Sequence, residues 1–413
     1  MYEEFEISED VLKKSKKALD RVKEQFAYID EVAEYNQLKV LKAFTKNKVA
    51  EAHFYGTSGY GYDDLGRETI EKIYADIFRT EDALVRMQFV SGTHAISACF
   101  FGILRPGDIL LAISGKPYDT LNETIIGEGI GSLKDFGINY HEIELDDNFN
   151  IRLDEVFEYI AKNKVKMVEI QRSKGYGWRK TFSAEYINEI IHKIHKRFPD
   201  TVCFVDNCYG ELVDRVEPYE ADLIAGSLIK NLGGGITPTG AYVAGKKKYV
   251  DLVAQRLTSP GIGKECGSTL GFNKYVLQGL FMAAHVVSQA IKTAVFCAGL
   301  LEEVGFTAEP ASSEIRHDII QSVKLGNKDY LIKFCQGLQS ASPIDSFVVP
   351  VPWAMPGYSD EVIMAAGAFN QGSSIELSAD APIKEPYIVY MQGGLTFEAG
   401  KIGVMKAVSN MLK

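Results

Sequence analysis

Apolar residues recur along this chain with two different spacings, and each spacing predicts a different kind of element. Between Val11 and Val32 they return at every third or fourth position, which predicts an amphipathic N-terminal helix. From about residue 68 onward, helical stretches alternate with short apolar runs. This alternation is typical of a mainly parallel sheet that is covered by helices on both faces. The pattern predicts a helix over 184–198 and strands over 109–113, 166–170, 201–206, 222–227 and 239–244.

The C-terminal third of the chain has a different pattern. Residues 269–304 keep helical spacing without a proline, which predicts a long helix that crosses between two domains. After it, 317–325 and 346–351 have the character of strands and predict a smaller α+β domain, against which the N-terminal helix is expected to pack. We therefore expect an N-terminal helical segment over 1–50, a large domain over 51–300 and a small domain over 301–413.

Composition narrows the class of ligand. The 413 residues are 46% hydrophobic and 24% charged, as in an ordinary globular protein, and carry a net charge of −10. Nucleic acid or an anionic membrane surface would call for a basic patch, so a small-molecule ligand is expected instead. The acidic start of the chain does not resemble a signal peptide, and the six cysteines have no C-x-x-C spacing. Both features favour a reducing cytoplasm.

Three features with distinct chemistry lie near the ends of predicted strands. Asp206 ends the strand 201–206, and ligands in α/β sheets bind at the carboxyl ends of strands. Ser91-Gly92-Thr93 is a turn that opens a helical run, and such a helix start binds phosphate. Lys230 stands between the apolar strand 222–227 and a loop of small residues, where partial desolvation would disfavour the ammonium and leave a nucleophile. This order of features predicts a pyridoxal phosphate (PLP) site.

The sequence gives no support to a dinucleotide site, a metal site or a serine hydrolase. The glycine-rich run at 127–132 lacks the last glycine of a dinucleotide fingerprint and the surrounding strand–turn–helix unit. His192 and His195 share one helix face, but without a third ligand they predict a solvated pair rather than a metal site. No G-x-S-x-G elbow is present, so hydrolase chemistry has no support.

With these residues in view, the chain resembles fold-type I PLP enzymes of the cystathionine and methionine lyase class. More narrowly, it resembles the methionine gamma-lyase-like family that is also called the aluminium resistance protein family. The matching segments span roughly residues 50 to 400 and are Gly59-Tyr60-Gly61-Tyr62-Asp63-Asp64-Leu65-Gly66-Arg67, Glu81-Asp82-Ala83-Leu84-Val85-Arg86, Ser91-Gly92-Thr93-His94-Ala95, Val205-Asp206-Asn207, Met355-Pro356-Gly357-Tyr358 and Gln392-Gly393-Gly394-Leu395.

The resemblance implies roles for the residues of the expected PLP site. Lys230 would carry PLP and act as acid and base, and Asp206 would pair with the pyridine nitrogen. Tyr118, in the loop after the strand 109–113, would stack on the ring, although an exposed loop tyrosine is an equal alternative. The phosphate would be held by Ser91, Gly92, Thr93 and Ser227.

Two departures from the better-known lyases affect the phosphate site. Those enzymes place a Tyr-x-Arg pair over the phosphate of the neighbouring subunit, where this chain has Tyr62 and Asp64; Arg67 could supply the missing cation. They also carry a threonine immediately before the lysine, where this chain has Ile229.

The substrate side of the site is less defined. The resemblance implies that an arginine of the small domain meets the substrate carboxylate. We expect Arg316 there, because no other arginine lies beyond Arg256, with Lys384 as the second choice. A surface salt bridge is the alternative for either residue. Tyr60 completes the expected substrate contacts.

The function implied by the resemblance is a PLP-dependent carbon–sulfur lyase acting on a sulfur-containing amino acid. The alternatives are another PLP reaction, such as γ-replacement or aminotransfer, and a non-catalytic PLP-binding stress-response protein. The aromatic segment 55–67 is expected to form an arm that a second copy of the chain covers. We therefore expect a homodimer with a shared active site, assembled into a homotetramer.

Overall fold

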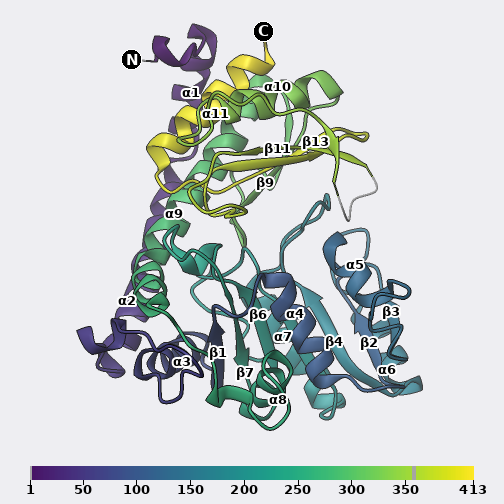
Figure 1. Ribbon diagram of the computed structural model, residues 1–413. Helices are drawn as coiled ribbons and strands as arrows, with labels where there is room; N and C mark the ends of the chain where they lie inside the picture. The colour runs from purple at the N-terminus through teal and green to yellow at the C-terminus, as the bar shows by residue number, and fades with distance from the viewer. Residues whose placement is uncertain (1, 356–359) are drawn as a thin grey trace.

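Two sheets organise the chain, and they lie in two parts joined by one long helix (Figure 1). The computed structural model describes residues 2–355 and 360–413. In the larger part, seven strands pair in the order β1-β7-β6-β5-β4-β2-β3, parallel from β6 through β3 and antiparallel at β7 and β1. These strands are β1 (Asp82–Arg86), β2 (Ile109–Ala112), β3 (Asn139–Glu142), β4 (Val165–Gln171), β5 (Val202–Asp206), β6 (Leu223–Ser227) and β7 (Ala241–Gly245).

Helices cover both faces of this sheet, and β2, β5 and β6 bury apolar side chains on both of them. One face is covered by α4 (Gly92–Ile103), α5 (Asp119–Ile126) and α8 (Lys247–Leu257), which share a core with Phe204 and Leu110. The other face is covered by α3 (Leu65–Phe78), α6 (Leu153–Lys162), α7 (Ala184–Arg197) and the first third of α9 (Phe272–Val304). The expected doubly covered, mostly parallel sheet is therefore confirmed.

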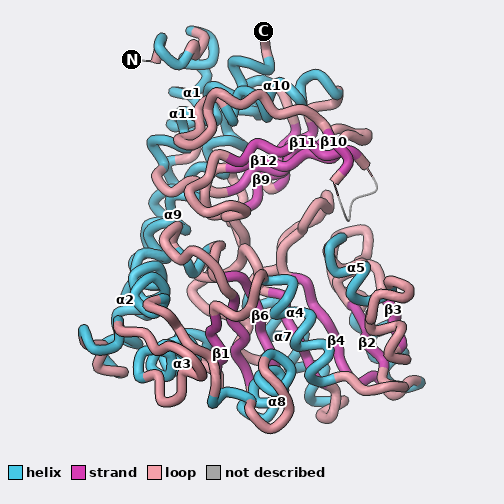
Figure 2. The backbone as a smooth tube through the Cα atoms, viewed as in Figure 1, coloured by secondary structure: helices cyan, strands magenta, loops and turns pink. Residues whose placement is uncertain are grey.

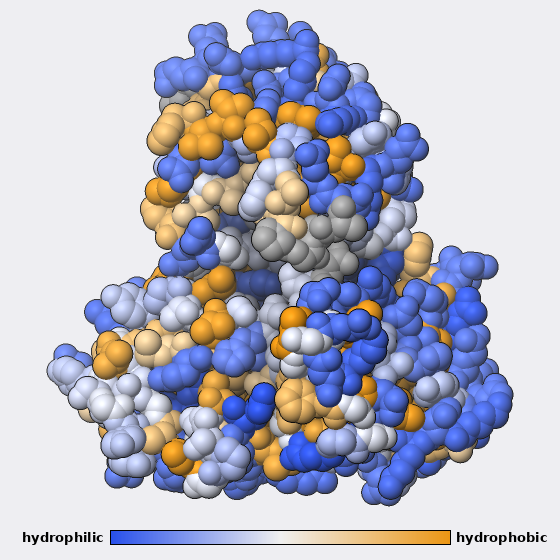
Figure 3. All heavy atoms as spheres, turned by 45° about the vertical axis from the view of Figure 1, so that its right-hand side comes forward, coloured by the Kyte–Doolittle hydropathy of each residue, from blue (hydrophilic) through white to orange (hydrophobic). Residues whose placement is uncertain are grey.

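The smaller part is an antiparallel sheet of six strands with helices against it (Figure 2). Its strand order is β10-β11-β12-β13-β9-β8. The elements are β8 (Thr307–Glu309), β9 (Ile320–Lys324), α10 (Lys328–Gln339), β10 (Trp353–Ala354), β11 (Glu361–Ala366), β12 (Ser378–Pro382), β13 (Ile388–Gln392) and α11 (Phe397–Met411). With all atoms drawn, the molecule narrows between its two parts (Figure 3).

The long helix α9 joins the cores of both parts. Its 33 residues are long and apolar enough to cross a membrane, but 72% of its most apolar window is buried inside the protein, as expected of a core helix. The N-terminal segment also divides between the parts. The helix α1 (Glu9–Arg21) buries Val11 against the smaller sheet, whereas α2 (Lys23–Lys46) buries Val40 in the larger core. The expected packing on the small domain therefore describes α1 and the start of α2, where the Phe26 ring lies 5.0 Å from the Phe397 ring of α11, but not the rest of α2.

Two local expectations are wrong. Residues 346–351 form no strand, and Phe347, Val349 and Val351 are exposed; Pro350 and Pro352 lack the N–H that a strand ladder needs. The strand β1 ends at Arg86, and Phe89 and Val90 lie in the loop that leads to the Ser91 turn. The single helix expected over 11–32 is divided into α1 and α2 at Val22. Pro356-Gly357-Tyr358, part of one motif quoted above, lies outside the described residues.

Candidate active site

One cavity at the carboxyl edge of the large sheet collects the three features that the sequence places at strand ends. Its lining joins the start of α4, the ends of β5 and β6, and the loop that carries Lys230. Tyr118 closes one side, and Gly372 enters from the smaller part. The lining includes Ser91, Gly92, Thr93, Tyr118, Gln171, Asp206, Cys208, Tyr209, Ser227, Ile229 and Lys230.

The start of α4 presents free hydrogen-bond donors to this cavity. The Ser91 hydroxyl caps the helix by accepting the His94 N–H at 3.1 Å. No acceptor for the N–H groups of Gly92 and Thr93 is found among the described residues. A Cβ on Gly92 would lie 3.2 Å from the Ser227 Cβ and 3.4 Å from the Cys208 sulfur, so only glycine leaves this approach open. Such a pocket suits a phosphate group.

Asp206 is a buried carboxylate that lacks a cationic hydrogen-bond donor within the described part of the chain. It is 6% exposed and accepts the Cys208 N–H at 3.1 Å. Burial raises the pKa of Asp206, although the positive charge of Lys230 and the Cys208 N–H oppose the shift. A protonated ring nitrogen would complete the hydrogen bonding of this carboxylate.

Lys230 lies over an aromatic ring rather than in an apolar pocket. Its Nζ is 3.8 Å from the centroid of the Tyr209 ring, within the range of a cation–π contact. Burial lowers the pKa of Lys230, as its apolar flanks lead us to expect, but the negative charge that Cys208, Tyr209 and Asp206 can carry opposes burial, and this pKa is raised overall.

A buried polar network holds the segment after Asp206 in place. Arg172, fully buried, donates from Nη1 to the Asn207 side-chain oxygen and from Nη2 to Asp214, both at 2.7 Å. Asp214 also lies 2.8 Å from His317 of the smaller part. A Cβ on Gly210 would lie 2.6 Å from the Arg172 guanidinium, so the chain passes this side chain at a glycine. Sequence reasoning missed Arg172, although it directly follows a buried strand.

Tyr118 separates the first cavity from a second, cationic one. Its N–H donates to Gln171 Oε1 at 2.7 Å, and its ring stands edge-on to Tyr176 at 6.1 Å. The second cavity shares Tyr118, Gln171 and Gly175 with the first. Four cationic side chains line it, Lys116, Lys174, Arg179 and Lys384, together with the carboxylates of Glu144 and Asp146. Lys384 is exposed and lies 3.4 Å from Asp360.

Arg316, the first choice for the substrate carboxylate, does not line either of these cavities. It is 5% exposed, and it donates to Gln321 at 2.6 Å and to the Ala311 carbonyl at 3.3 Å. It lines a separate apolar cavity between α2 and α9. The expectation for Arg316 is wrong because it came from elimination along the sequence, which overlooked arginines in the loop after β4.

The aromatic arm lies away from this chain's own cavity. Tyr60 and Tyr62 are 73% and 56% exposed, and their rings stack at 5.6 Å. Arg67 is buried, and its Nη1 donates to the carbonyls of Gly61 and Gly267. Asp64 caps α3 by accepting the Arg67 N–H at 2.9 Å. In this conformation, Arg67 and Asp64 hold the arm to its own chain.

Asp64 is ionised under all ordinary conditions. Burial alone would raise the pKa of Asp64, but hydrogen bonds from the Thr269 and Thr57 hydroxyls and from the Arg67 N–H lower it to about 2.

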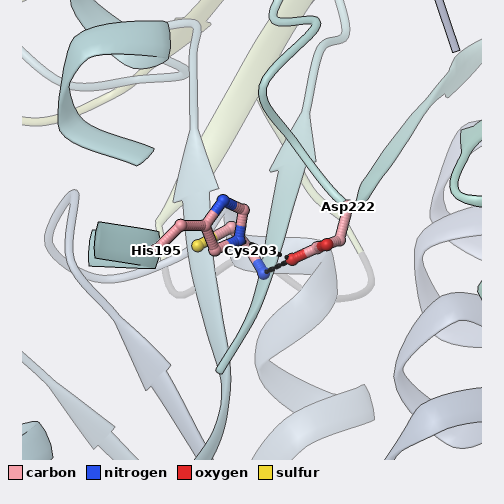
Figure 4. A group of neighbouring side chains, drawn as sticks. All are labelled: His195, Cys203 and Asp222. Atoms are coloured by element: carbon pink, nitrogen blue, oxygen red, sulfur yellow. Dashed lines mark hydrogen bonds and ion pairs between the residues drawn. The ribbon is translucent and has the colours of Figure 1, made fainter. Parts of the chain in front are cut away.

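A group of potential metal ligands lies at the opposite edge of the sheet. His195, Cys203 and Asp222 converge there (Figure 4). Asp222 accepts the Cys203 N–H at 2.7 Å and lies 2.9 Å from His195 Nε2. Its other oxygen is 2.6 Å from Lys246 Nζ, which already neutralises the carboxylate. We therefore describe this group as an ion-pair cluster that ties α7 to the starts of β5 and β6.

The residues of the first cavity fit PLP. Backbone N–H groups at a helix start suit its phosphate, and the lysine suits its aldehyde. Asp206, which has no cationic hydrogen-bond donor among the described residues, suits its ring nitrogen. The ring of Tyr118 lines the same cavity as these three groups.

Comparison with known proteins agrees with this geometry. Residues 11–412 match the methionine gamma-lyase family. The uncharacterized protein YnbB of Bacillus subtilis (strain 168) is 50% identical over 390 residues, which cover 93% of this chain and 92% of YnbB. A carbon–sulfur lyase involved in aluminum resistance from Clostridium novyi NT is 50% identical, with a TM-score of 0.95 over 98% of this chain and 97% of that one.

A more distant structure shows the fold alone. The pyridoxal-5'-phosphate dependent protein YhfS of Escherichia coli has a TM-score of 0.62 at 15% identity, over 92% of this chain and 96% of its own. The sheet order and the cavity at its carboxyl edge are thus set in a fold that PLP-dependent proteins use. The chain belongs to the methionine gamma-lyase family.

Proposed function

We propose that this protein is a PLP-dependent carbon–sulfur lyase of the cytoplasm. It would convert a sulfur-containing amino acid and one water into a thiol, a keto acid and ammonia. The observation that carries the proposal is the single cavity in which a helix start, a strand-end carboxylate and a lysine converge. When bound there, PLP supplies the electron sink that stabilises negative charge at the substrate α-carbon.

The residues of this chain would divide the work between holding and proton transfer. Ser91, Gly92, Thr93 and Ser227 would bind the phosphate, and Asp206 would keep the ring nitrogen protonated. The Tyr118 ring would lie against the cofactor and keep water away from that face. The Lys230 amine would remove the proton from the substrate α-carbon and return a proton later in the reaction.

The second cavity is our proposed site for the substrate carboxylate. It shares a wall with the first cavity, and its four cations outnumber the two carboxylates in its lining. Of the cations, Lys384 was expected from the sequence and Arg179 was not. Arg179 already donates from Nη1 to the Lys180 carbonyl at 2.9 Å and from Nη2 to the Gln171 and Ser173 carbonyls at 2.9 and 2.7 Å, so it would attract a carboxylate mainly through its charge. We therefore propose Lys384 as the direct partner of the carboxylate and Arg179 as the supporting charge.

We also propose that two chains share each active site and that two such dimers form a homotetramer. Tyr55, Tyr60 and Tyr62 are 70%, 73% and 56% exposed, a large apolar area for one chain to leave in water. In related lyases the matching arm lies over the partner's phosphate. Tyr62 and Tyr60 would reach the partner's cofactor and substrate, and Arg67 would fix the arm that carries them.

The test is turnover without a second substrate. Purified protein supplied with PLP should release keto acid and thiol from at least one member of a panel of sulfur amino acids. Lys230→Ala should abolish this release. After borohydride treatment, the peptide that contains residue 230 of this variant should carry no reduced cofactor. Keto acid that forms only with an added second substrate would instead indicate aminotransfer, and bound PLP without any product would indicate a non-catalytic protein.

The shared site has its own experiment. Lys230→Ala subunits and Tyr62→Ala, Arg67→Ala subunits should each be inactive, and mixing them should restore activity. Each mixed dimer then contains one site with every defect and one site with none. Absence of recovery, with subunit exchange demonstrated by mass spectrometry, would refute the shared site and leave the lyase proposal standing.

A further inference from the structure

Glu169 is the residue whose surroundings are least explained by the fold. It lies in the middle of β4, is 0% exposed, and neither of its carboxyl oxygens has a hydrogen-bond partner among the described residues. Buried carboxyl groups are almost always hydrogen-bonded, since an unpaired one costs free energy. An acid kept in the centre of a strand at that cost indicates a role beyond packing.

The strand register places Glu169 behind Asp206. Glu169 pairs with Phe204 of β5, and Gln171 pairs with Asp206, so Glu169 and Asp206 point to the same face of the sheet. They are one strand apart laterally and two residues apart along the strand, which corresponds to roughly 8 Å between their Cβ atoms. Both therefore lie on the face that α4 and α5 cover, with Asp206 at the cofactor cavity and Glu169 one layer deeper.

Few charged groups act on Glu169. Asp206 on β5 repels its ionised form, and Arg179 in the loop after β4 attracts it. Burial is the main cause of the raised pKa of Tyr140 on β3, to which the charge of Glu169 also contributes. The Tyr140 hydroxyl donates to Glu142 at 2.6 Å and not to Glu169. The covering helices contribute apolar side chains and the Cys99 thiol, whose own pKa burial raises. Burial, with the Asp206 charge in support, raises the pKa of Glu169 to about 8.

We propose that Glu169 is a positioning residue that acts through Asp206, as a second carboxyl group whose removable proton sets how strongly Asp206 holds a protonated ring nitrogen. This inference rests on the proposed PLP site. When Glu169 is neutral, one negative charge faces the ring; when its proton has left to solvent, two do. Only this proton moves, and no covalent bond to carbon forms or breaks. A cofactor with a positive ring nitrogen favours the second state and therefore lowers the pKa of Glu169 when it binds.

The pH dependence of cofactor binding follows from this linkage. An opposite charge at 4–6 Å lowers a carboxyl pKa by roughly 1–3 units, and at the larger distance here we take about one unit, equivalent to a tenfold change in affinity. The ratio of wild-type to Glu169→Gln affinity for PLP should be constant below pH 7 and should rise about tenfold by pH 10. Contributions from Lys230 and from the cofactor itself cancel in the ratio.

The experiment is equilibrium dialysis of PLP against wild type and Glu169→Gln between pH 6 and pH 10. A cofactor analogue with carbon in place of the ring nitrogen is the matched control, and its ratio should stay flat. A flat ratio with PLP itself overturns the inference. If PLP fails to bind wild type at all, the proposed function falls instead, so the two failures are distinguishable.

A second variant and a spectroscopic measurement test the inference if Glu169→Gln folds poorly. Glu169→Met removes the same proton with an apolar side chain and should give the same ratio as Glu169→Gln. In wild type, the infrared carbonyl band of a protonated carboxylic acid should persist at pH 7, disappear as the pH passes 8, and disappear at lower pH when PLP is bound. Absence of a band that the Glu169 variants remove would overturn the inference.

Discussion

Replacement of Arg172 by methionine should loosen the segment that carries Asp206. The guanidinium makes two charge-assisted hydrogen bonds at 2.7 Å, to Asp214 and Asn207, and a third contact at 3.3 Å to the Phe182 carbonyl. Arg172 is fully buried and Asp214 is 7% exposed, so the variant would remove one of the two basic side chains that contact this buried carboxylate, Arg172 and His317. Removing one partner of a buried pair costs about 3–5 kcal/mol, and we expect that loss in the free energy of unfolding.

Urea unfolding at pH 7 measures this loss, and hydrogen exchange of residues 206–214 shows where it acts. Arg152→Met is the control, because Arg152 and Glu155 form a pair at 3.1 Å with 41% and 55% of their side chains exposed. That pair should contribute about 0–1 kcal/mol. Arg172→Lys keeps the charge without the planar donors and should fall between the two. Equal unfolding midpoints for Arg172→Met and Arg152→Met would refute the role of the network.

Three further predictions concern crowding, pH and the ring nitrogen. Gly210→Ala should cost about 1–3 kcal/mol, seen as a lower Tm, because the new Cβ would lie 2.6 Å from Arg172; Gly299→Ala, with 3.3 Å to its nearest neighbour, should change Tm less. Burial alone would raise the pKa of Asp222, but His195, Lys246 and the Cys203 N–H lower it. Its stabilisation is therefore present above about pH 4 and lost as the pH falls, and Asp222→Asn should flatten that acid decline in urea titrations. Asp206→Asn should retain PLP yet slow exchange of the substrate α-hydrogen with deuterated solvent by more than about tenfold; wild-type exchange would remove Asp206 from the mechanism.

The parts of the site that the sequence predicted are those that follow from strand ends. Asp206 ends β5, the Ser91 turn opens α4 and Lys230 lies three residues after β6. The carboxyl ends of parallel strands meet at one edge whatever the details of packing. The same rule would have found Arg172, which follows β4 directly. The mostly parallel sheet was predictable for a similar reason, because strand–helix alternation leaves few other arrangements.

Other features depend on contacts between distant residues and could not be predicted. Arg316 was chosen because few arginines lie near the C-terminus, but side-chain partners such as Gln321 decide where a guanidinium points. Glu169 stands in an apolar run that correctly predicts a strand, and only the register with β5 reveals its relation to Asp206. The raised pKa of Lys230 likewise depends on Tyr209 and Cys208, which arrive from another loop.

The helix α9 has a consequence for attempts to divide this protein. Its first turns, up to Ala284, belong to the core of the larger part, and the turns from Ala294 to Leu301 belong to that of the smaller part. A cut within α9 would divide a helix that both cores share, and a fragment that begins within α9 would also lose α1, which packs in the smaller core. We therefore do not expect the smaller part to fold as an autonomous unit without α1. Because both cores share α9, new termini made by circular permutation should be tolerated in surface loops but not within this helix.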